Sequence, residues 1–315
     1  NCYFVKKELK KGLVYRSTGS WYSVESDGIF YACRIKGKLR LKGIKSTNPI
    51  AVGDHVLFEV DENAEASEGT IVEIEERQNY IVRKSVNLSK QTHIIASNID
   101  QVFLITLHNP PTFTAFIDRF LVTAEAYHIP SILVFNKLDT CTPMQEKEID
   151  ELASVYTKIG YPTLKISATN GMNVSKIESM MENKVSMFSG HSGVGKSTLI
   201  NAIAPDLNLK TGAISEQHQQ GIHTTTFAEM FALSNGMKLI DTPGIKGFGV
   251  VDMQSDEIGK YFPEFISFKS GCKFHNCLHK NEPQCAVIQA FENGSIAKSR
   301  YQNYIQMLEN DSTYR

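Results

Sequence analysis

The chain has 315 residues, of which 42% are hydrophobic and 21% are charged, and its formal net charge is −1. This composition excludes a disordered or fibrous chain and is typical of soluble globular proteins, while the length favours two or three domains. No apolar run reaches the ~18 residues of a membrane-spanning helix, and the first residues lack the apolar segment of a signal peptide. We therefore expect a cytoplasmic protein.

The first 88 residues are predicted to form a small β-barrel. Short alternating runs, from GLVYRSTG at residue 12 to GTIVEIEE at residue 69, are separated by glycine and polar turns, as in small barrels. Residues 1–50 carry eleven Lys and Arg against three Asp and Glu, whereas residues 51–88 carry three against nine. One half of this region is therefore basic.

Basic and apolar residues alternate between residues 34 and 42, so a strand pair there would have one basic and one buried face. Two interpretations stay open: the basic face is only solvated, or it binds RNA as an OB-type barrel does. No acid interrupts the stretch from Cys33 to Ile50, which favours RNA. The candidate RNA-binding residues are Arg34, Lys36, Lys38, Arg40 and Lys42.

From about residue 99 the chain alternates between buried-strand candidates, such as DQVFLITL and SILVF, and segments with apolar residues at helical spacing. This alternation predicts an α/β domain with a mostly parallel sheet. The segment TFAEMFALSNGMKLIDTPG predicts a hairpin that turns at Asn235-Gly236. After about residue 254 the chain becomes rich in Cys and His and then helical. We predict three domains, at residues 1–88, 89–253 and 254–315.

Residues 190–197, GHSGVGKS, match the phosphate-binding pattern G-x-x-x-x-G-K-[ST], after an apolar strand and before an apolar helix. The glycines let backbone N–H groups face phosphate oxygens. Lys196 would reach the β- and γ-phosphates, and the Ser197 hydroxyl would ligate Mg²⁺. The predicted phosphate-binding residues are Gly190, His191, Ser192, Gly193, Val194, Gly195, Lys196, Ser197 and Thr198.

The tetrapeptide NKLD at residues 136–139 ends a predicted strand, ahead of the phosphate loop in the chain. The carboxylate of Asp139 can accept hydrogen bonds from guanine N1–H and the exocyclic amine, a donor pair that adenine lacks. Asn136 can bond the purine edge and tie loops together, and the Lys137 stem can cover the base plane. After the next strand, Ser167 and Ala168 allow backbone approach to the base oxygen. A simple cap or turn is the alternative interpretation.

The motif DTPG at residues 241–244 follows the predicted hairpin, where a nucleotide switch belongs. Asp241 can hold Mg²⁺ through water, and the N–H of Gly244 can meet the γ-phosphate. Many GTP hydrolases carry next a Gln that orients the attacking water, but here Ile245 offers no hydrogen bond. Another side chain must therefore orient that water.

The loop QGIHTTTF supplies candidates for this role. His223 is predicted to orient the attacking water, since an imidazole can accept a proton near neutral pH, although a lone loop histidine can also be merely solvated. His191 is a second candidate. Thr225, or its neighbour Thr224, can complete the Mg²⁺ shell, so Ser197, Thr225 and Asp241 are the predicted magnesium residues.

A cysteine cluster near residue 280 indicates a metal site. The segment GCKFHNCLHKNEPQC has the spacing C-x4-C-x-H-x5-C, which fits a closed tetrahedral zinc site. His275 could compete as a ligand, and reduced buried cysteines are the alternative. The predicted zinc ligands are Cys272, Cys277, His279 and Cys285.

Together and in this order, these motifs resemble the circularly permuted, ribosome small-subunit-dependent GTPases, the RsgA/YjeQ family. The resemblance spans nearly the whole chain and implies an OB-fold, a GTPase domain with NKLD ahead of the phosphate loop, and a helical zinc domain. It implies GTP hydrolysis stimulated by the small ribosomal subunit in its late maturation, and a catalytic role for His223. The family usually has Arg or Lys before that histidine, where this chain has Ile222.

The expected partners are the small ribosomal subunit and its RNA, with no DNA and no membrane, and we expect a monomer. Because DTPG now precedes the zinc domain, nucleotide-dependent ordering after Gly244 could reposition that domain. Two rival hypotheses stay open: an ATP-dependent P-loop enzyme, against which Asp139 argues, and a zinc-dependent RNA-binding module whose nucleotide is only structural.

Overall fold

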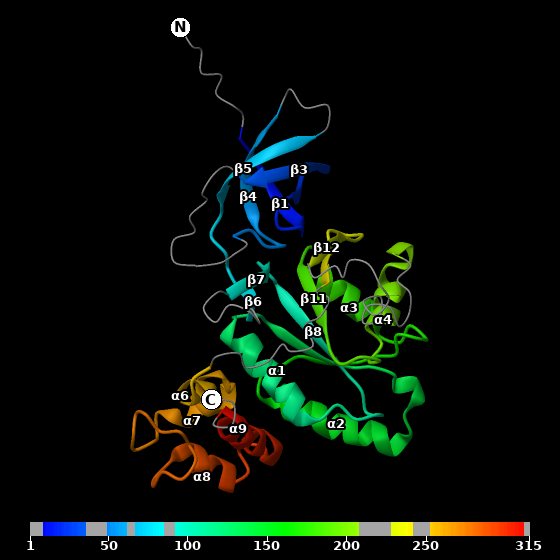
Figure 1. Ribbon diagram of the computed structural model, residues 1–315. Helices are drawn as coiled ribbons and strands as arrows, with labels where there is room; N and C mark the ends of the chain where they lie inside the picture. The colour runs from blue at the N-terminus through cyan, green and yellow to red at the C-terminus, as the bar shows by residue number, and fades with distance from the viewer. Residues whose placement is uncertain are drawn as a thin grey trace. The chain divides into compact units, whose positions relative to one another are not determined.

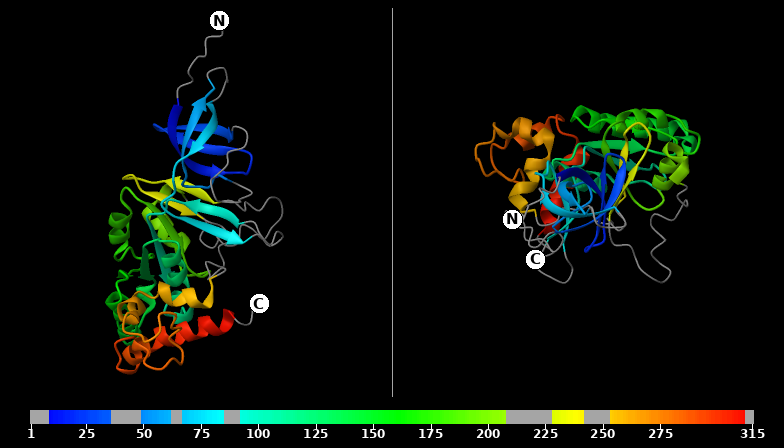
Figure 2. Two further views of the ribbon diagram at one scale, coloured as in Figure 1. Left: turned by 90° about the vertical axis from the view of Figure 1, so that its left-hand side faces the viewer. Right: turned by 90° about the horizontal axis from the view of Figure 1, so that it is seen from above.

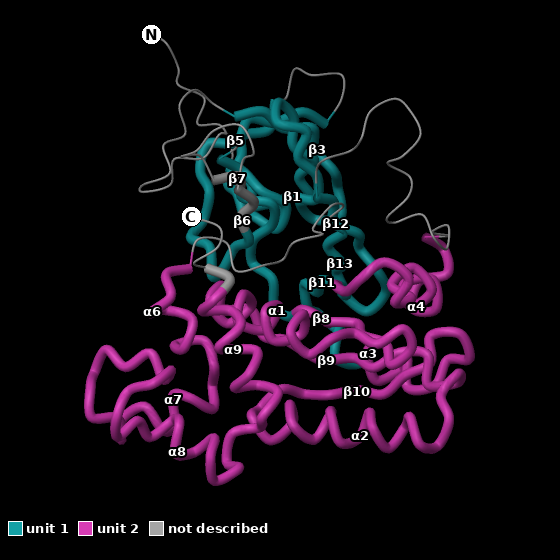
Figure 3. Tube along the Cα trace, turned by 60° about the horizontal axis from the view of Figure 1, so that its bottom comes forward, with its two compact units in different colours: residues 1–101, 178–188, 212–245 teal, residues 102–177, 189–211, 246–315 magenta. Residues whose placement is uncertain are grey.

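The computed structural model describes residues 9–35, 49–61, 67–84, 92–207, 228–241 and 253–311 (Figure 1). The contacts divide the chain into two compact units, which Figure 3 distinguishes by colour. The first unit collects residues 1–101, 178–188 and 212–245, and the second collects residues 102–177, 189–211 and 246–315. Within the described ranges, no helix has the length and apolar character to cross a bilayer.

The first unit contains a five-stranded barrel, as predicted. Strand β1 pairs with β2 and β4, β2 with β3, and β5 with both β3 and β4, so the strands close around one core (Figure 2). Val14, Val24 and Phe58 are fully buried in this core. The strands are β1 (Leu9–Ser17), β2 (Tyr22–Ser26), β3 (Ile29–Ile35), β4 (His55–Val60) and β5 (Glu68–Ile74).

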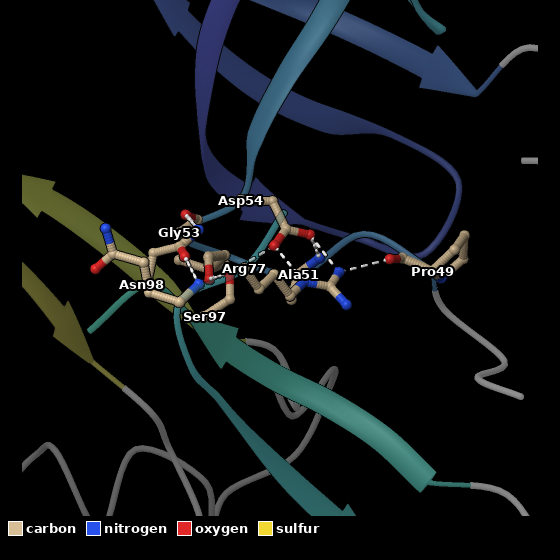
Figure 4. A network of polar contacts seen from close by, with 9 residues as sticks. Pro49, Ala51, Gly53, Asp54, Arg77, Ser97 and Asn98 are labelled. Atoms are coloured by element: carbon tan, nitrogen blue, oxygen red, sulfur yellow. Dashed lines mark hydrogen bonds and ion pairs between the residues drawn. The ribbon is translucent and has the colours of Figure 1, made fainter. Parts of the chain in front are cut away.

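A buried ion pair fixes the barrel to the chain segment that follows it (Figure 4). The Asp54 carboxylate accepts two hydrogen bonds from the Arg77 guanidinium, at 2.5 and 2.6 Å, and one from the Ser97 hydroxyl at 2.6 Å. Ser97 ends β7 (Thr92–Ser97), which pairs with β6 (Tyr80–Lys84). The predicted domain boundary at residue 88 thus falls between two paired strands that the sequence analysis did not predict.

Three further strands carry the hairpin that the sequence predicts. Strand β12 (Glu229–Ala232) pairs antiparallel with β13 (Lys238–Asp241), which lies parallel to β11 (Val185–Ser189). Asn235 and Gly236 have φ of 54° and 68°, the left-handed values that such hairpin turns require. Strand β12 also pairs with barrel strand β1, where Arg16 lies opposite Glu229 and forms an ion pair with it.

The second unit contains a parallel sheet with helices, which confirms the α/β prediction. Strand β9 (Ser131–Phe135) lies between β8 (Gln101–Thr106) and β10 (Thr163–Lys165). Helix α2 begins with a capping box between Thr142 and Gln145. The helices of this part are α1 (Thr114–Ala126), α2 (Pro143–Lys158), α3 (Val174–Met181) and α4 (Lys196–Ile203), with 3₁₀ turns at Leu138–Thr140 and Pro205–Leu207.

The C-terminal region is helical, as predicted, and packs beside α1 (Figure 1). Phe262, Phe265 and Tyr304 form its buried aromatic core, and Val122 of α1 belongs to the same cluster. The helices are α6 (Ser255–Ile258), α7 (Pro263–Lys269), α8 (Ala286–Glu292) and α9 (Lys298–Asp311), with a 3₁₀ turn at Gly259–Tyr261.

Candidate functional site

The motif NKLD, which is predicted to bind guanine, lies where β9 ends. Its lysine, Lys137, adopts a left-handed conformation with φ of 64°, which turns the chain into the 3₁₀ turn that contains Asp139. The Ser167 hydroxyl donates a hydrogen bond of 2.5 Å to the Asp139 carboxylate. Ser167 is fully buried whereas Asp139 is exposed. A buried hydroxyl therefore orients a carboxylate that stays accessible to a base.

Asn136 ties three segments of this site together. Its side-chain amide donates a hydrogen bond of 2.8 Å to the Val194 carbonyl of the phosphate loop, and its side-chain oxygen accepts one of 3.0 Å from the Ala168 N–H. Asn136 is only 3% exposed. Because both polar ends of this side chain have protein partners, Asn136 joins the loop of Ala168 to that of Val194. Tying loops together is one of the two roles predicted for it from the sequence.

The phosphate loop, residues 190–197, leads into α4, whose first turn contains Lys196, Ser197 and Thr198. Gly190 has φ of 143°, and a Cβ there would collide with the Ile105 carbonyl of β8. A Cβ on Gly195, whose φ is 94°, would collide with the Asn136 amide. Only glycine satisfies both the backbone angles and the close approaches at these two positions.

Lys196 is held over the phosphate loop. Its ammonium group donates hydrogen bonds of 2.7 and 2.8 Å to the carbonyls of Gly190 and His191. The loop thus places a cation beside the curled backbone, the arrangement that binds the phosphates of a nucleotide.

His191 packs against helix α1 instead of standing free. Its imidazole lies on the Phe116 ring with 3.8 Å between ring centroids and 34° between ring planes. Partial burial, and then the charge of Lys196, lower the pKa of His191 below its usual 6.5. The side chain is occupied by an aromatic contact, which disfavours it as the water-orienting residue.

Several predicted site residues lie outside the described ranges. Asp241 is described and ends β13, half-buried, as the sequence predicts for the first residue of DTPG. Arg34 is exposed on β3, and its guanidinium lies 3.8 Å from the centroid of the Trp21 ring. The residues outside the described ranges are His223, Thr224, Thr225, Gly244, Lys36, Lys38, Arg40 and Lys42.

The four predicted zinc ligands come together, with all their ligand atoms within 4.8 Å of one another. Cys272 Sγ lies 3.8 Å from Cys285 Sγ and 3.7 Å from His279 Nδ1, and Cys285 Sγ lies 3.3 Å from His279 Nδ1. Two thiolates on one tetrahedral Zn²⁺ at about 2.3 Å would lie about 3.8 Å apart. The residues therefore fit a tetrahedral zinc ion, whereas His275 is exposed and lies outside this cluster.

The loop around these ligands is fixed by its own hydrogen bonds. The Glu282 carboxylate accepts hydrogen bonds from the N–H groups of Leu278 and Lys280, at 2.7 and 2.8 Å. The hydroxyls of Tyr301 and Tyr304 donate to the carbonyls of His279 and Leu278, at 2.8 and 2.6 Å. Helix α9 therefore holds the backbone that carries His279, a predicted zinc ligand.

Comparison with known proteins identifies the family. The model of the RsgA GTPase matches residues 74–251, and that of the RsgA N-terminal domain matches residues 11–71. The first match alone covers more than half of the chain. The chain belongs to the RsgA GTPase family. It is thus a GTP hydrolase, with GTP as substrate, GDP as product and Mg²⁺ as the metal ion. The resemblance seen in the sequence is confirmed.

Two relatives of similar length agree with membership of the RsgA family. The chain is 63% identical over 303 residues to the small ribosomal subunit biogenesis GTPase RsgA of Christiangramia forsetii, covering 96% of each chain. It is 63% identical over 308 residues to the protein of the same name from Flavobacterium johnsoniae, covering 96% and 94%.

Two crystal structures share the fold of this RsgA-family chain. YjeQ from Thermotoga maritima is 33% identical with a TM-score of 0.79, covering 98% of this chain and all of that one. YloQ, described as a circularly permuted GTPase, is 28% identical with a TM-score of 0.76, covering 100% and 99%. The order of NKLD before the phosphate loop is therefore the permuted order of a known GTPase fold.

Some contacts that hold this site in place in the RsgA-family chain could not be recognised in the sequence. Phe116 and Asp118 lie in a helix that the apolar pattern predicts, but neither belongs to a motif. Asp118 is a charged residue in the largely apolar stretch FIDRFLV, which is the one signal that it could be buried with a partner. Its partner, Arg300, stands in a polar stretch without any such signal.

Proposed function

We propose that this chain hydrolyses GTP to GDP and phosphate during biogenesis of the small ribosomal subunit. The observation that carries the proposal is the 63% identity to the Christiangramia forsetii protein of that name, over 96% of both chains. The 303 aligned residues include both the proposed guanine-binding and the proposed phosphate-binding parts of the chain. The proposed partner is therefore the small subunit with its RNA, and the proposed location is the cytoplasm, where ribosomes are assembled.

The nucleotide roles follow from the chemistry of the described residues. Asp139, oriented by Ser167, accepts from guanine N1–H and the exocyclic amine, which gives selectivity over adenine. Lys196 and the N–H groups of the phosphate loop bind the β- and γ-phosphates. Ser197 and Asp241 offer the hydroxyl and carboxylate oxygens that Mg²⁺ prefers. The remaining proposed nucleotide contacts are Asn136, Lys137, Ala168, Gly190, His191, Ser192, Gly193, Val194, Gly195, Thr198 and Gly244.

His223 is the proposed water-orienting residue. Its imidazole can accept a hydrogen bond from the water that attacks the γ-phosphorus, while the bond from phosphorus to the β–γ bridging oxygen breaks and GDP leaves. The contact of His191 with Phe116 supports this assignment, because it occupies the competing histidine. Thr225 is the proposed third magnesium residue.

Cys272, Cys277, His279 and Cys285 are the proposed ligands of one structural Zn²⁺. A bound zinc ion would cross-link the loop between α7 and α8, in a region whose helices are short. The barrel, through Arg34 and the basic residues 36–42, is the proposed contact with ribosomal RNA, and a monomer with domains at residues 1–88, 89–253 and 254–315 is the proposed organisation.

The test is steady-state hydrolysis of GTP with and without purified small subunits, with ATP as the control nucleotide. Small subunits should raise the rate for GTP, ATP should be a poor substrate, and Lys196→Ala should abolish turnover. His223→Ala should strongly reduce the stimulated rate. Equal rates with and without small subunits would overturn the ribosomal role.

The alternative, a zinc-dependent RNA-binding module with a structural nucleotide, predicts a different outcome. In that case Lys196→Ala would leave binding to the small subunit intact and no multiple turnover of GTP would be detected in any condition. If His223→Ala leaves the stimulated rate unchanged, the proposed GTP hydrolysis would stand, but the water-orienting role of His223 would be refuted.

A further inference from the structure

The phosphate loop is held at both of its ends by residues from other segments of the second unit. Near its C-terminal end, the Asn136 amide bonds the Val194 carbonyl at 2.8 Å. Near its N-terminal end, His191 packs on Phe116 of α1, with 3.8 Å between ring centroids. Asn136 belongs to the predicted guanine-binding motif. Phe116 belongs to α1, a helix to which no role in the reaction has been assigned above.

Helix α1 is in turn held by the C-terminal helical region. Asp118 lies two residues after Phe116, about 200° further round the helix, so it faces away from the phosphate loop. Its carboxylate is fully buried and accepts hydrogen bonds from Arg300 at 2.7 Å, Asn303 at 2.6 Å and Tyr156 at 2.8 Å. Two of these three donors belong to α9.

The Arg300 guanidinium is the centre of this contact. It is 1% exposed, and besides its bond to Asp118 it donates two hydrogen bonds to Glu264 of α7, at 2.7 and 3.0 Å. The fork geometry of arginine fixes direction as well as distance. The two carboxylates are thereby locked to one cation, and α1 cannot rotate or slide against α7 and α9 without breaking these bonds.

These contacts form one continuous connection from the C-terminal helices to the phosphate loop. We propose that Phe116 is a positioning residue for GTP: it holds His191 and the first turn of the phosphate loop, and Arg300 holds the helix that carries Phe116. The C-terminal region thus contributes to nucleotide binding without touching the nucleotide. This inference rests on the proposed role of residues 190–197 in binding the phosphates.

The physical reason is the cost of ordering the loop. The N–H groups that bind phosphate must all face one point, and an anchored loop loses less conformational freedom on binding than a loose one. An aromatic contact of this kind, lost on truncation, corresponds to about a two- to tenfold weaker affinity. Truncating Phe116 should weaken nucleotide binding and raise KM more than it changes kcat, because Phe116 does not contact the reacting atoms.

The experiment measures the Kd for GDP, and kcat and KM for GTP, in the full-length chain. Phe116→Ala should weaken GDP binding about two- to tenfold and raise KM with little change in kcat. Phe116→Tyr, which retains a ring, should restore the affinity. The matched control is Phe113→Ala, because Phe113 is the residue before α1 and is 72% exposed.

The Arg300 step has its own test. Arg300→Lys retains the charge but loses the fork, so it should weaken GDP binding in the native background and have no further effect in the Phe116→Ala background. Equal losses in both backgrounds would overturn the connection through α1, as would a Phe116→Ala affinity equal to that of Phe113→Ala. If the native chain binds GDP no better than Lys196→Ala does, the proposed role of the phosphate loop fails instead.

Discussion

Replacing Arg300 with methionine should strongly destabilise the second unit. Methionine fills much of the arginine volume but removes three hydrogen bonds, one to Asp118 and two to Glu264. Both carboxylates are buried, at 0% and 8% exposure, so each would keep its charge without a cation or take up a proton. Removing one partner of a buried ion pair typically costs about 3 to 5 kcal/mol.

Thermal unfolding followed by far-ultraviolet circular dichroism measures this change. For a folding unit of about 170 residues, a loss of 3 to 5 kcal/mol lowers Tm by about 6 to 20 °C. The matched control is Arg119→Met, which makes the same replacement on α1 at an exposed position and should change stability by less than about 0.5 kcal/mol. Equal Tm values for the two variants would refute the reasoning.

The remaining predictions concern the base, the metal and one titration. Asp139→Asn replaces one carboxylate acceptor with a donor, so nucleotide preference should move from GTP towards xanthosine triphosphate; a competition assay that still favours GTP would contradict guanine recognition by this residue. Removing zinc with a chelator should lower the helical signal and release about one metal ion per chain, and zinc but not magnesium should restore it; full helicity without zinc would count against a structural ion. The folded-state pKa of His191 lies below 6.5, so its contribution to stability is present above that pH and is lost as the pH falls below it. The native chain should therefore lose more stability than His191→Gln between pH 7 and about pH 5; equal losses would contradict a neutral, packed histidine.

Motifs that depend on local spacing could be predicted from the sequence. The phosphate loop and NKLD were recognised because each follows an apolar strand, and the Asn235-Gly236 turn was recognised because few residue pairs suit its backbone angles. The Cys/His cluster followed from the spacing of four residues within fourteen positions. Each of these signals is contained in a short stretch of chain, so no tertiary information was needed.

Contacts between distant segments could not be predicted in this way. Asp118 and Arg300 are 182 residues apart, and nothing in either local pattern indicates the other. The same holds for the pairing of β1 with β12 and for the ion pair of Asp54 with Arg77. Such contacts depend on how elements pack, and a charged residue in an apolar helix shows only that some partner must exist.

The predicted repositioning of the zinc domain has to be considered together with the Arg300 contact. The segment after Gly244, on which that hypothesis depends, lies outside the described residues. The C-terminal helices share a core cluster with Val122 of α1 and are bonded to Asp118. A displacement of these helices against α1 would break buried ion pairs, so we expect any movement to carry α1 with it.

The pairing of β1 with β12 also bears on how the chain is made. Arg16 and Glu229 are separated by 213 residues, which take about 10 to 40 s to synthesise at ~5 to 20 residues per second. Once β5 has been synthesised, the nascent barrel has its five strands, but the part of β1 that pairs with β12 exposes its backbone groups until β12 has also been made. An unpaired strand of this kind is a site for wrong pairing. The time between the synthesis of the barrel and that of β12 is therefore when the nascent chain most needs protection from other chains.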